Sequence, residues 1–232
     1  MSSLQHRATA SEHMDAPDLA PATYAAVLAD LARVNRVTLA ARPTIAFLER
    51  ALARRQNFRL LDVGFGQGDM LRTIAAWAAR TGRHAQLVGI DLNPSSAPVA
   101  RQMTDPALPI RYETGDYREL AGEPFDLVIS SLVAHHMTHD EIVAFIRFME
   151  KEARSGWHIN DLHRHRLAYS GYPVLARLLR CHWIVREDGR LSIARAFRPA
   201  DWPPILAAAG LNPAIPEVRR FFPFRLCVTR IR

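Results

Sequence analysis

The sequence predicts a doubly wound α/β fold, in which a mostly parallel sheet is covered by helices on both faces. Short apolar segments alternate with amphipathic helical segments between residues 59 and 161, and this alternation is typical of parallel strands joined by helical crossovers. The first apolar segment runs directly into a glycine-rich turn and then a helix, a common arrangement at ligand sites. A length of 232 residues suits one such domain with additional covering elements.

Local periodicity predicts the individual elements. Apolar side chains at helical spacing predict helices at residues 21–33, 43–54, 69–80, 139–154 and 201–209. Short apolar or β-rich runs predict strands at residues 59–63, 86–90, 110–113, 125–130, 157–161, 216–222 and 224–231. A tight connection joins the last two runs, so we expect the sheet to end in an antiparallel pair.

Two segments stand outside this alternation. Residues 1–20 are polar, and we expect them to form a loose tail. Residues 162–200 are an insert that carries a cationic helical piece at 166–180, which we expect Pro173 to break. We interpret this insert as a lid over a substrate pocket, although a basic amphipathic helix could also make peripheral contact with a membrane.

Composition excludes several classes of protein. The chain is 49% hydrophobic and 23% charged, which rules out collagen-like and disordered proteins. The net charge of +7 permits nucleic-acid binding without implying it, because arginine is used in place of lysine throughout and Lys151 is the only lysine. Cys181 and Cys227 match neither a disulfide framework nor a metal-ligand spacing. Neither an apolar signal core nor a membrane-length apolar run is present, so we expect a cytoplasmic protein.

The strongest local motif is the glycine loop LLDVGFGQGD at residues 60–69. Its glycines at 64, 66 and 68 allow backbone N–H groups to approach a ligand closely. A dinucleotide fingerprint would need its third glycine at position 69, where the chain has Asp69. A carboxylate at the helix start disfavours a pyrophosphate, so the loop indicates a ligand that is not phosphorylated and carries positive charge.

Two further carboxylates end predicted strands. Asp91 follows the second strand, where α/β nucleotide folds place a carboxylate for ribose hydroxyls; the alternative is a helix N-cap. Asp116 follows the third strand and could accept a hydrogen bond from an adenine amino group, while Tyr117 lies along the ring. The alternative for Asp116 is a capped turn.

Four segments in this order resemble the class I S-adenosylmethionine-dependent methyltransferases: LLDVGFGQGDML (60–71), LVGIDLNP (87–94), YETGDY (112–117) and FDLVISSLVAHHM (125–137). The resemblance covers residues 55–232. The segments INDLHRHRLAY (159–169) and LADLARVNRVTLAARPT (28–44) are similar to small-molecule enzymes of quinone biosynthesis and of phenolic polyketide pathways.

The resemblance implies a Rossmann-like, seven-stranded methyltransferase domain at residues 56–232, with a tail and helical cover at 1–55 and the lid at 162–200. It implies S-adenosylmethionine as the cofactor and S-adenosylhomocysteine as the product. It assigns cofactor contacts to nine residues: Asp62, Gly64, Gly66 and Gly68 at the methionine part, Asp91 and Leu92 at the ribose and beside the adenine, Asp116 and Tyr117 at the adenine, and Ser130 on the floor.

Methyl transfer is an in-line displacement, so the protein must align the acceptor and remove its proton. His135 and His136 follow the fourth strand and open onto the crevice where acceptors bind in such folds, so at least one is a candidate base. The alternative is that one of them packs the following helix. Asp161 ends the fifth strand and could orient a histidine, or it could cap the lid helix.

Three residues are candidates for the substrate side. Asn35 and Arg42 in the N-terminal helices could close over the methionine carboxylate or the substrate, and Tyr169 lies in the lid. We expect no metal, because Ser130 and Ser131 stand after the fourth strand, where catechol-type enzymes of this fold carry acidic ligands.

The sequence thus predicts methylation of a small, fairly hydrophobic hydroxylated aromatic or polyketide-like acceptor, on oxygen rather than carbon, with a histidine base. The alternatives are C-methylation of a quinone-type precursor, a nucleic-acid methyltransferase, a nicotinamide oxidoreductase and a non-catalytic cofactor-binding protein. A nucleic acid is not expected as a partner, since the segment after the fourth strand lacks the Asn/Asp-Pro-Pro-aromatic motif of base amino-methylation. A monomer or a homodimer is expected.

Overall fold

A computed structural model describes residues 4–16 and 18–232. Its seven strands form one sheet in the order β3-β2-β1-β4-β5-β7-β6. The strands are β1 (Asn57–Val63), β2 (His84–Asp91), β3 (Ile110–Thr114), β4 (Leu127–Ser131), β5 (Gly156–Leu162), β6 (Glu217–Phe221) and β7 (Arg225–Ile231). The first five pair in parallel, and β7 pairs antiparallel with both β5 and β6. The mostly parallel sheet with a C-terminal antiparallel pair is confirmed.

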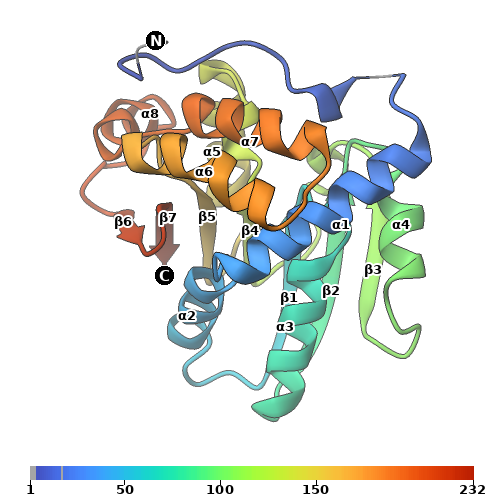
Figure 1. The fold of residues 1–232 in the computed structure, drawn as a ribbon. Helices are drawn as coiled ribbons and strands as arrows, with labels where there is room; N and C mark the ends of the chain where they lie inside the picture. The colour runs from blue at the N-terminus through green and yellow to red at the C-terminus, as the bar shows by residue number, and fades with distance from the viewer. Residues whose placement is uncertain (1–3, 17) are drawn as a thin grey trace.

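Within the part of the chain that the structure describes, eight α-helices surround this sheet (Figure 1). They are α1 (Pro21–Val37), α2 (Arg42–Ala51), α3 (Asp69–Arg80), α4 (Ser96–Gln102), α5 (His139–Glu152), α6 (Arg166–Leu178), α7 (Trp183–Arg195) and α8 (Trp202–Ala208). Short 3-10 turns add η1 (His13–Asp15), η2 (Tyr117–Leu120), η3 (Ala134–His136) and η4 (Pro199–Asp201). No helix in the described part of the chain is long and apolar enough to cross a membrane.

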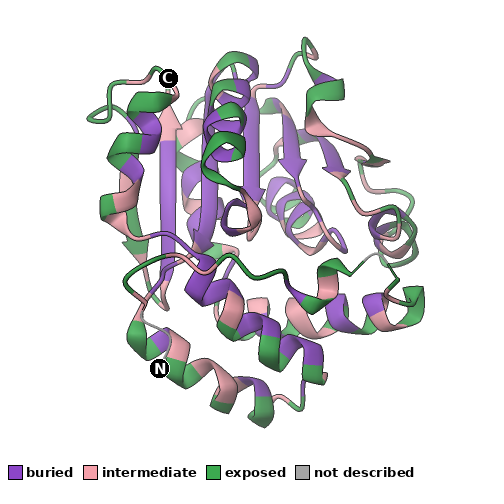
Figure 2. Cartoon of the chain, turned by 90° about the horizontal axis from the view of Figure 1, so that it is seen from above, coloured by how far each residue is buried: buried purple, intermediate pink, exposed green. Residues whose placement is uncertain are grey.

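Alternate residues of the central strands build two cores, one on each face of the sheet (Figure 2). Leu61 of β1 points into the core beneath α5 and α8, whereas its neighbour Leu60 points into the core beneath α2, α3 and α4. Both faces are therefore covered, which explains why these strands read as continuous apolar runs.

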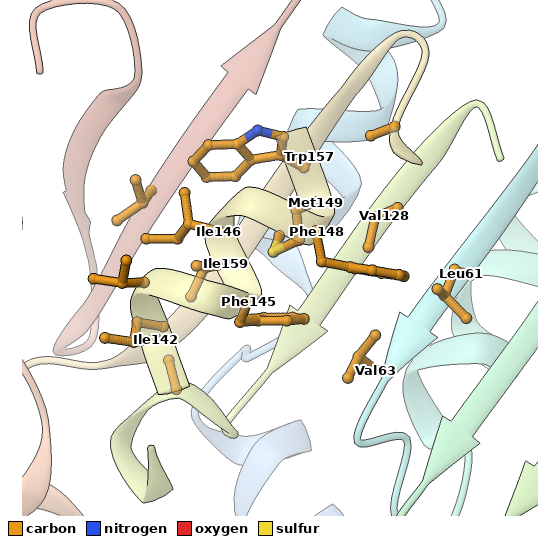
Figure 3. Packing of buried hydrophobic residues seen from close by; sticks show 14 of the residues in the cluster. Leu61, Val63, Val128, Ile142, Phe145, Ile146, Phe148, Met149, Trp157 and Ile159 are labelled. Atoms are coloured by element: carbon orange, nitrogen blue, oxygen red, sulfur yellow. The ribbon is translucent and has the colours of Figure 1, made fainter. Parts of the chain in front are cut away.

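Helix α5 shows how sequence signals produce one of these layers (Figure 3). Thr138 and Glu141 form a capping box that starts the helix. Ile142, Phe145 and Met149 then recur at helical spacing and are fully buried against the sheet. Burying these three side chains stabilises the domain by roughly 5–8 kcal/mol in transfer free energy.

A third layer lies along the carboxyl ends of the parallel strands, where α1, α6 and α7 pack together (Figure 1). Helices α6 and α7 come from the segment predicted as an insert. Helix α6 continues through Pro173, so the expected break is wrong. Proline removes only one helical hydrogen bond, and packing of α6 along α7 holds the rest of the helix.

The expectation of a loose tail is also wrong for the described residues before α1. Arg7 Nε donates to the carbonyl of Arg195 at 2.6 Å, and the backbone N–H of Ala8 donates to the carbonyl of Ala194 at 3.1 Å. The backbone N–H groups of His13 and Met14 both donate to Asp188, each at 2.9 Å. The tail is thus fixed against α7 by contacts between residues far apart in sequence.

The glycines of α6 and α7 offer a matched test of this packing. A Cβ at Gly189 would overlap the ring of Tyr172, whereas a Cβ at Gly171 would meet nothing within 4 Å. We expect Gly189→Ala to lower the free energy of unfolding by about 1–3 kcal/mol through overpacking. Gly171→Ala should be neutral or should stabilise the helix by up to about 1 kcal/mol. Urea unfolding of both variants measures the difference, and equal effects would contradict the packing.

Candidate active site

A cavity of about 830 Å³ lies at the carboxyl ends of β1, β2 and β4. Its volume is near the upper end of the range for small-molecule sites, so a cofactor and an acceptor can lie side by side. The cavity is lined by the tail, by α1, by the loops after these three strands, by α6 and α7, and by residues 222–225.

The glycine loop after β1 forms one wall of the cavity. Gly64 and Gly66 line it with φ values of 77° and 56°, which favour glycine. Side chains would also not fit, since a Cβ at Gly64 would overlap Val133. Gly68 does not line the cavity; it lies against Tyr112 and starts α3 in the left-handed conformation. The loop therefore presents backbone to the cavity, as a cofactor cradle requires.

Carboxylates surround this loop. Asp91 lines the cavity beside exposed Leu92, and its Oδ2 accepts a hydrogen bond from the Gly66 N–H at 2.9 Å. Asp62 is buried behind the loop, and its Oδ1 has no hydrogen-bond partner among the described residues. Burial raises the pKa of Asp62 well above its ordinary value, and the nearby carboxylates of Asp69 and Asp91 raise it further. A cationic ligand such as a sulfonium with an ammonium group would favour the charged forms of these crowded carboxylates, so the arrangement fits such a ligand.

Asp116, assigned to the adenine, and Ser130, assigned to the floor of the cofactor site, do not line the cavity. Asp116 caps η2: its Oδ1 accepts from the backbone N–H of Arg118 at 2.9 Å, and its carboxylate also pairs with the Arg118 guanidinium. The capped turn is therefore what the structure shows at Asp116. Ser130 is buried and donates to the Val63 carbonyl at 3.0 Å, whereas its neighbour Ser131 lines the cavity. Tyr117 does line it, packed on the α5 phenylalanines.

The histidine pair lies in η3, and the two side chains have different surroundings. His135 is 3% exposed, and its Nδ1 lies 2.7 Å from Asp161 Oδ1. The His135 backbone N–H donates to the other oxygen of Asp161 at 2.8 Å. Burial alone would raise the pKa of Asp161, but its interactions with His135 outweigh burial and hold this pKa below its ordinary value. A charged Asp161 keeps the proton on Nδ1 of His135, which leaves Nε2 as the acceptor.

A glutamate that sequence reasoning missed faces this pair. Glu12 lines the cavity from the tail, with Oε1 3.7 Å from His135 Nε2 and Oε2 3.8 Å from His136 Nε2. Burial raises the pKa of Glu12 to about 7. The other ring nitrogen of His136, Nδ1, lies 3.1 Å from Asp15 Oδ2. The tail gave no signal for these contacts, because acidic residues in a polar segment resemble a solvated surface.

A metal ion could also be held by this cluster. Among the described side chains, the ligating atoms of Glu12, His135 and His136 lie within 4.8 Å of one another. The Arg195 guanidinium competes with a cation there, since its Nη1 lies 3.8 Å from Glu12 Oε1. The distances between Glu12 and the histidines exceed hydrogen-bond length, so Glu12 is not hydrogen-bonded to either imidazole.

The three candidates for the substrate side have different positions. Asn35 lines the cavity and accepts a hydrogen bond from Arg225 Nη2 at 3.1 Å. Arg42 is exposed at the start of α2, away from the cavity. Tyr169 is half-buried beneath Arg190, whose guanidinium lies 4.4 Å from its ring centre, and Tyr172 of the same helix lines the cavity instead.

Comparison with known proteins finds a family match that includes the glycine loop. Residues 60–156 match a family described as a methyltransferase domain. A ribosomal protein L11 methyltransferase from Deinococcus radiodurans is 36% identical over 99 residues, which are 38% of this chain and 34% of that protein. The chain therefore matches about a third of the length of this relative.

Two solved structures share the fold across most of the chain. Magnesium protoporphyrin IX methyltransferase from Synechocystis PCC 6803, with bound S-adenosylhomocysteine, has a TM-score of 0.57 at 19% identity and covers 86% of this chain and 84% of its own. Human N-acetylserotonin methyltransferase, in complex with S-adenosylmethionine, has a TM-score of 0.64 at 13% identity. The match covers 92% of this chain and 56% of the human protein's chain. Residues 60–156 thus match a methyltransferase domain, and the chain shares its fold with solved methyltransferases.

Proposed function

We propose that this chain is an S-adenosylmethionine-dependent methyltransferase and that it methylates a hydroxyl group on a small, fairly hydrophobic aromatic or polyketide-like acceptor. The observation that carries the proposal is the buried pair of His135 and Asp161, which lies on the same cavity as the glycine loop. A neutral imidazole held by a carboxylate is suited to take the proton of a phenol or an enol.

In this mechanism the glycine loop and Asp91 hold the cofactor, which supplies an electrophilic methyl group. Asp62 from behind the loop and Asp69 at the cavity wall would favour its positive charge, and Leu92 and Tyr117 would contact the adenosine part. His135 Nε2 accepts the hydroxyl proton, so that the acceptor oxygen could take the methyl group that a bound cofactor would supply, with S-adenosylhomocysteine as the leaving group. Asp161 accepts the Nδ1–H and stabilises the resulting imidazolium. Alignment by the cavity walls supplies the remaining rate enhancement.

The walls of the cavity support a hydrophobic acceptor. Apolar side chains reach it from several elements, among them Val133, Leu167, Leu175, Ile193 and Phe224. An apolar cavity beneath α1, α6 and α7 favours a small molecule over a nucleic acid, which would need an open basic groove. We assign α6 and α7 to a lid over the acceptor.

The carboxylates at the ends of β2 and β3 provide a matched pair for cofactor binding. We expect Asp91→Asn to weaken S-adenosylhomocysteine binding by about 10- to 100-fold, because it loses a charge-assisted contact and the bond that shapes the loop at Gly66. Asp116→Asn should change the affinity less than about 3-fold, since Asp116 caps a turn outside the cavity. Calorimetric titration measures both, and equal losses would contradict this placement of the adenosine.

Release of S-adenosylhomocysteine tests the proposed acceptor class. Hydroxylated aromatics and small polyketide-like phenols are each paired with the methyl ether of the same compound. We expect turnover with free hydroxyls and none with the blocked partners. Turnover of the ethers at the rate of the phenols would contradict oxygen as the acceptor atom.

A further inference from the structure

Arg225 is a buried cation on the cavity wall that the mechanism above does not use. It is the first residue of β7, it is 3% exposed, and it lines the cavity. Its Nη2 donates to Asn35 Oδ1, whereas its Nη1 has no hydrogen-bond partner among residues 4–16 and 18–232. A buried guanidinium keeps its charge, and leaving that charge without an anion costs several kcal/mol.

The two carboxylates whose charges act on Arg225 form no salt bridge with it. Asp161 and Asp69 both act on its pKa, which burial lowers, yet the described chain forms no salt bridge with Arg225 within 4.0 Å. Asp161 is committed to His135 and to the Leu162 N–H, which it accepts at 2.6 Å. The free edge of the guanidinium is therefore available to an anionic ligand in the cavity.

We infer that Arg225, positioned by Asn35, binds a carboxylate of the acceptor, so that the substrates are hydroxylated aromatic or polyketide-derived acids. The inference rests on the proposed function, because it names the substrate class of the same site. An arginine can hold a carboxylate through two parallel N–H···O bonds, which fixes both position and orientation. A carboxylate anchored at Arg225 would orient the acceptor ring with respect to His135.

Sheet order favours the acceptor over the cofactor as the source of this carboxylate. The glycine loop follows β1, and β7 is separated from β1 by β4 and β5. Three strand spacings amount to about 14 Å. Arg225 instead pairs with Leu162 in β5, one residue beyond the Asp161 that holds His135, and its neighbours on the cavity include Phe222 and Phe224. Its place in the sheet thus puts Arg225 beside the His135–Asp161 pair, while its charge also acts on Asp69 at the start of α3.

The first arm of the test compares acids with amides of the same shape. Salicylate, salicylamide, 4-hydroxybenzoate and 4-hydroxybenzamide are titrated into the protein saturated with S-adenosylhomocysteine. The wild-type protein should bind at least one acid about 10- to 100-fold more tightly than its amide. Arg225→Gln should abolish this preference, Arg225→Lys should retain part of it, and Arg220→Gln, at an exposed arginine of β6, should leave it unchanged. A wild-type protein without any preference for the acids overturns the inference.

The second arm identifies the source of the carboxylate. S-adenosylhomocysteine carries an amino-acid carboxylate, and 5′-methylthioadenosine has the same adenosine without it. We expect Arg225→Gln to bind both within about 3-fold of the wild-type affinities. A loss of at least about 10-fold for S-adenosylhomocysteine alone would assign Arg225 to the cofactor and overturn the inference. Since neither arm uses turnover, an acid preference together with methylation at carbon would refute the proposed function and leave this inference standing.

Discussion

Replacement of His135 by glutamine is expected to lower kcat by about 10²- to 10⁴-fold, the usual contribution of a general base. The glutamine preserves polarity near Asp161 but cannot accept the acceptor proton. Affinity for S-adenosylhomocysteine should stay within about 3-fold of the wild-type value, because the glycine loop and Asp91 remain intact. Steady-state release of S-adenosylhomocysteine and calorimetric titration separate the two effects.

Two further histidines provide controls for this result. His136→Gln should cost less than about 10-fold in kcat, because this side chain is held by Asp15 rather than by the buried Asp161. His139→Gln, at an exposed position at the start of α5, should have no effect. A variant His135→Gln with the wild-type kcat would contradict the role of His135 as the base.

Acidification is expected to destabilise the fold through His158. This β5 residue is 1% exposed, it stacks on Phe47 with ring centres 4.9 Å apart, and its Nδ1 lies 2.8 Å from Thr229 Oγ1. Burial lowers the pKa of His158 to about 3, whereas an unfolded histidine titrates near 6.5. The folded form therefore binds this proton less tightly than the unfolded form does. The contribution of neutral His158 to stability is complete above pH 6.5 and is lost as the pH falls towards 3.

The expected change in the free energy of unfolding follows from the difference in proton binding between the folded and unfolded forms. Between pH 7 and pH 5 the free energy of unfolding of the wild-type protein should fall by about 2 kcal/mol through this single group, and by about 4 kcal/mol between pH 7 and pH 3. His158→Gln cannot titrate, so the stability difference between wild type and variant should shrink by about 2 kcal/mol from pH 7 to pH 5. Urea unfolding at both values measures this difference, in which the other titrating groups cancel. A constant difference across this range would show that His158 is not buried in its neutral form.

Features with a local signal could be predicted from the sequence. The strands of the sheet were found because residues buried on both faces produce apolar runs, and the glycine loop because its backbone conformation requires glycine at Gly64 and Gly66. The pairing of Asp161 with a histidine after β4 was foreseen as one of two alternatives, from the rule that parallel strands end at one edge. The cap at Asp116 was foreseen only as an alternative, because a capping carboxylate and a ligand-binding carboxylate look alike in sequence.

Features that depend on distant contacts could not be predicted. Glu12 faces His135 only because Arg7 and Arg195 donate to carbonyls of η3 and α7 and thereby fix the tail. Helix α7 was missed because it is enclosed on several sides, so that its charged residues do not gather on one face. Its Asp188 is buried to accept two backbone N–H groups of the tail. Arg225 was hidden among many arginines, and its burial beside Asn35 sets it apart.

The chemical position of the transferred methyl group tests the central claim most directly. The protein is incubated with S-adenosylmethionine carrying a ¹³C-labelled methyl group and with an acceptor that turns over, and the product is examined by ¹³C NMR. We expect the label in the methoxy region of the spectrum, with the signal reduced about 10²- to 10⁴-fold in His135→Gln at equal reaction time. A label in the region of ring-bound methyl carbons, or a methoxy signal undiminished in His135→Gln, would contradict hydroxyl methylation with His135 as the base.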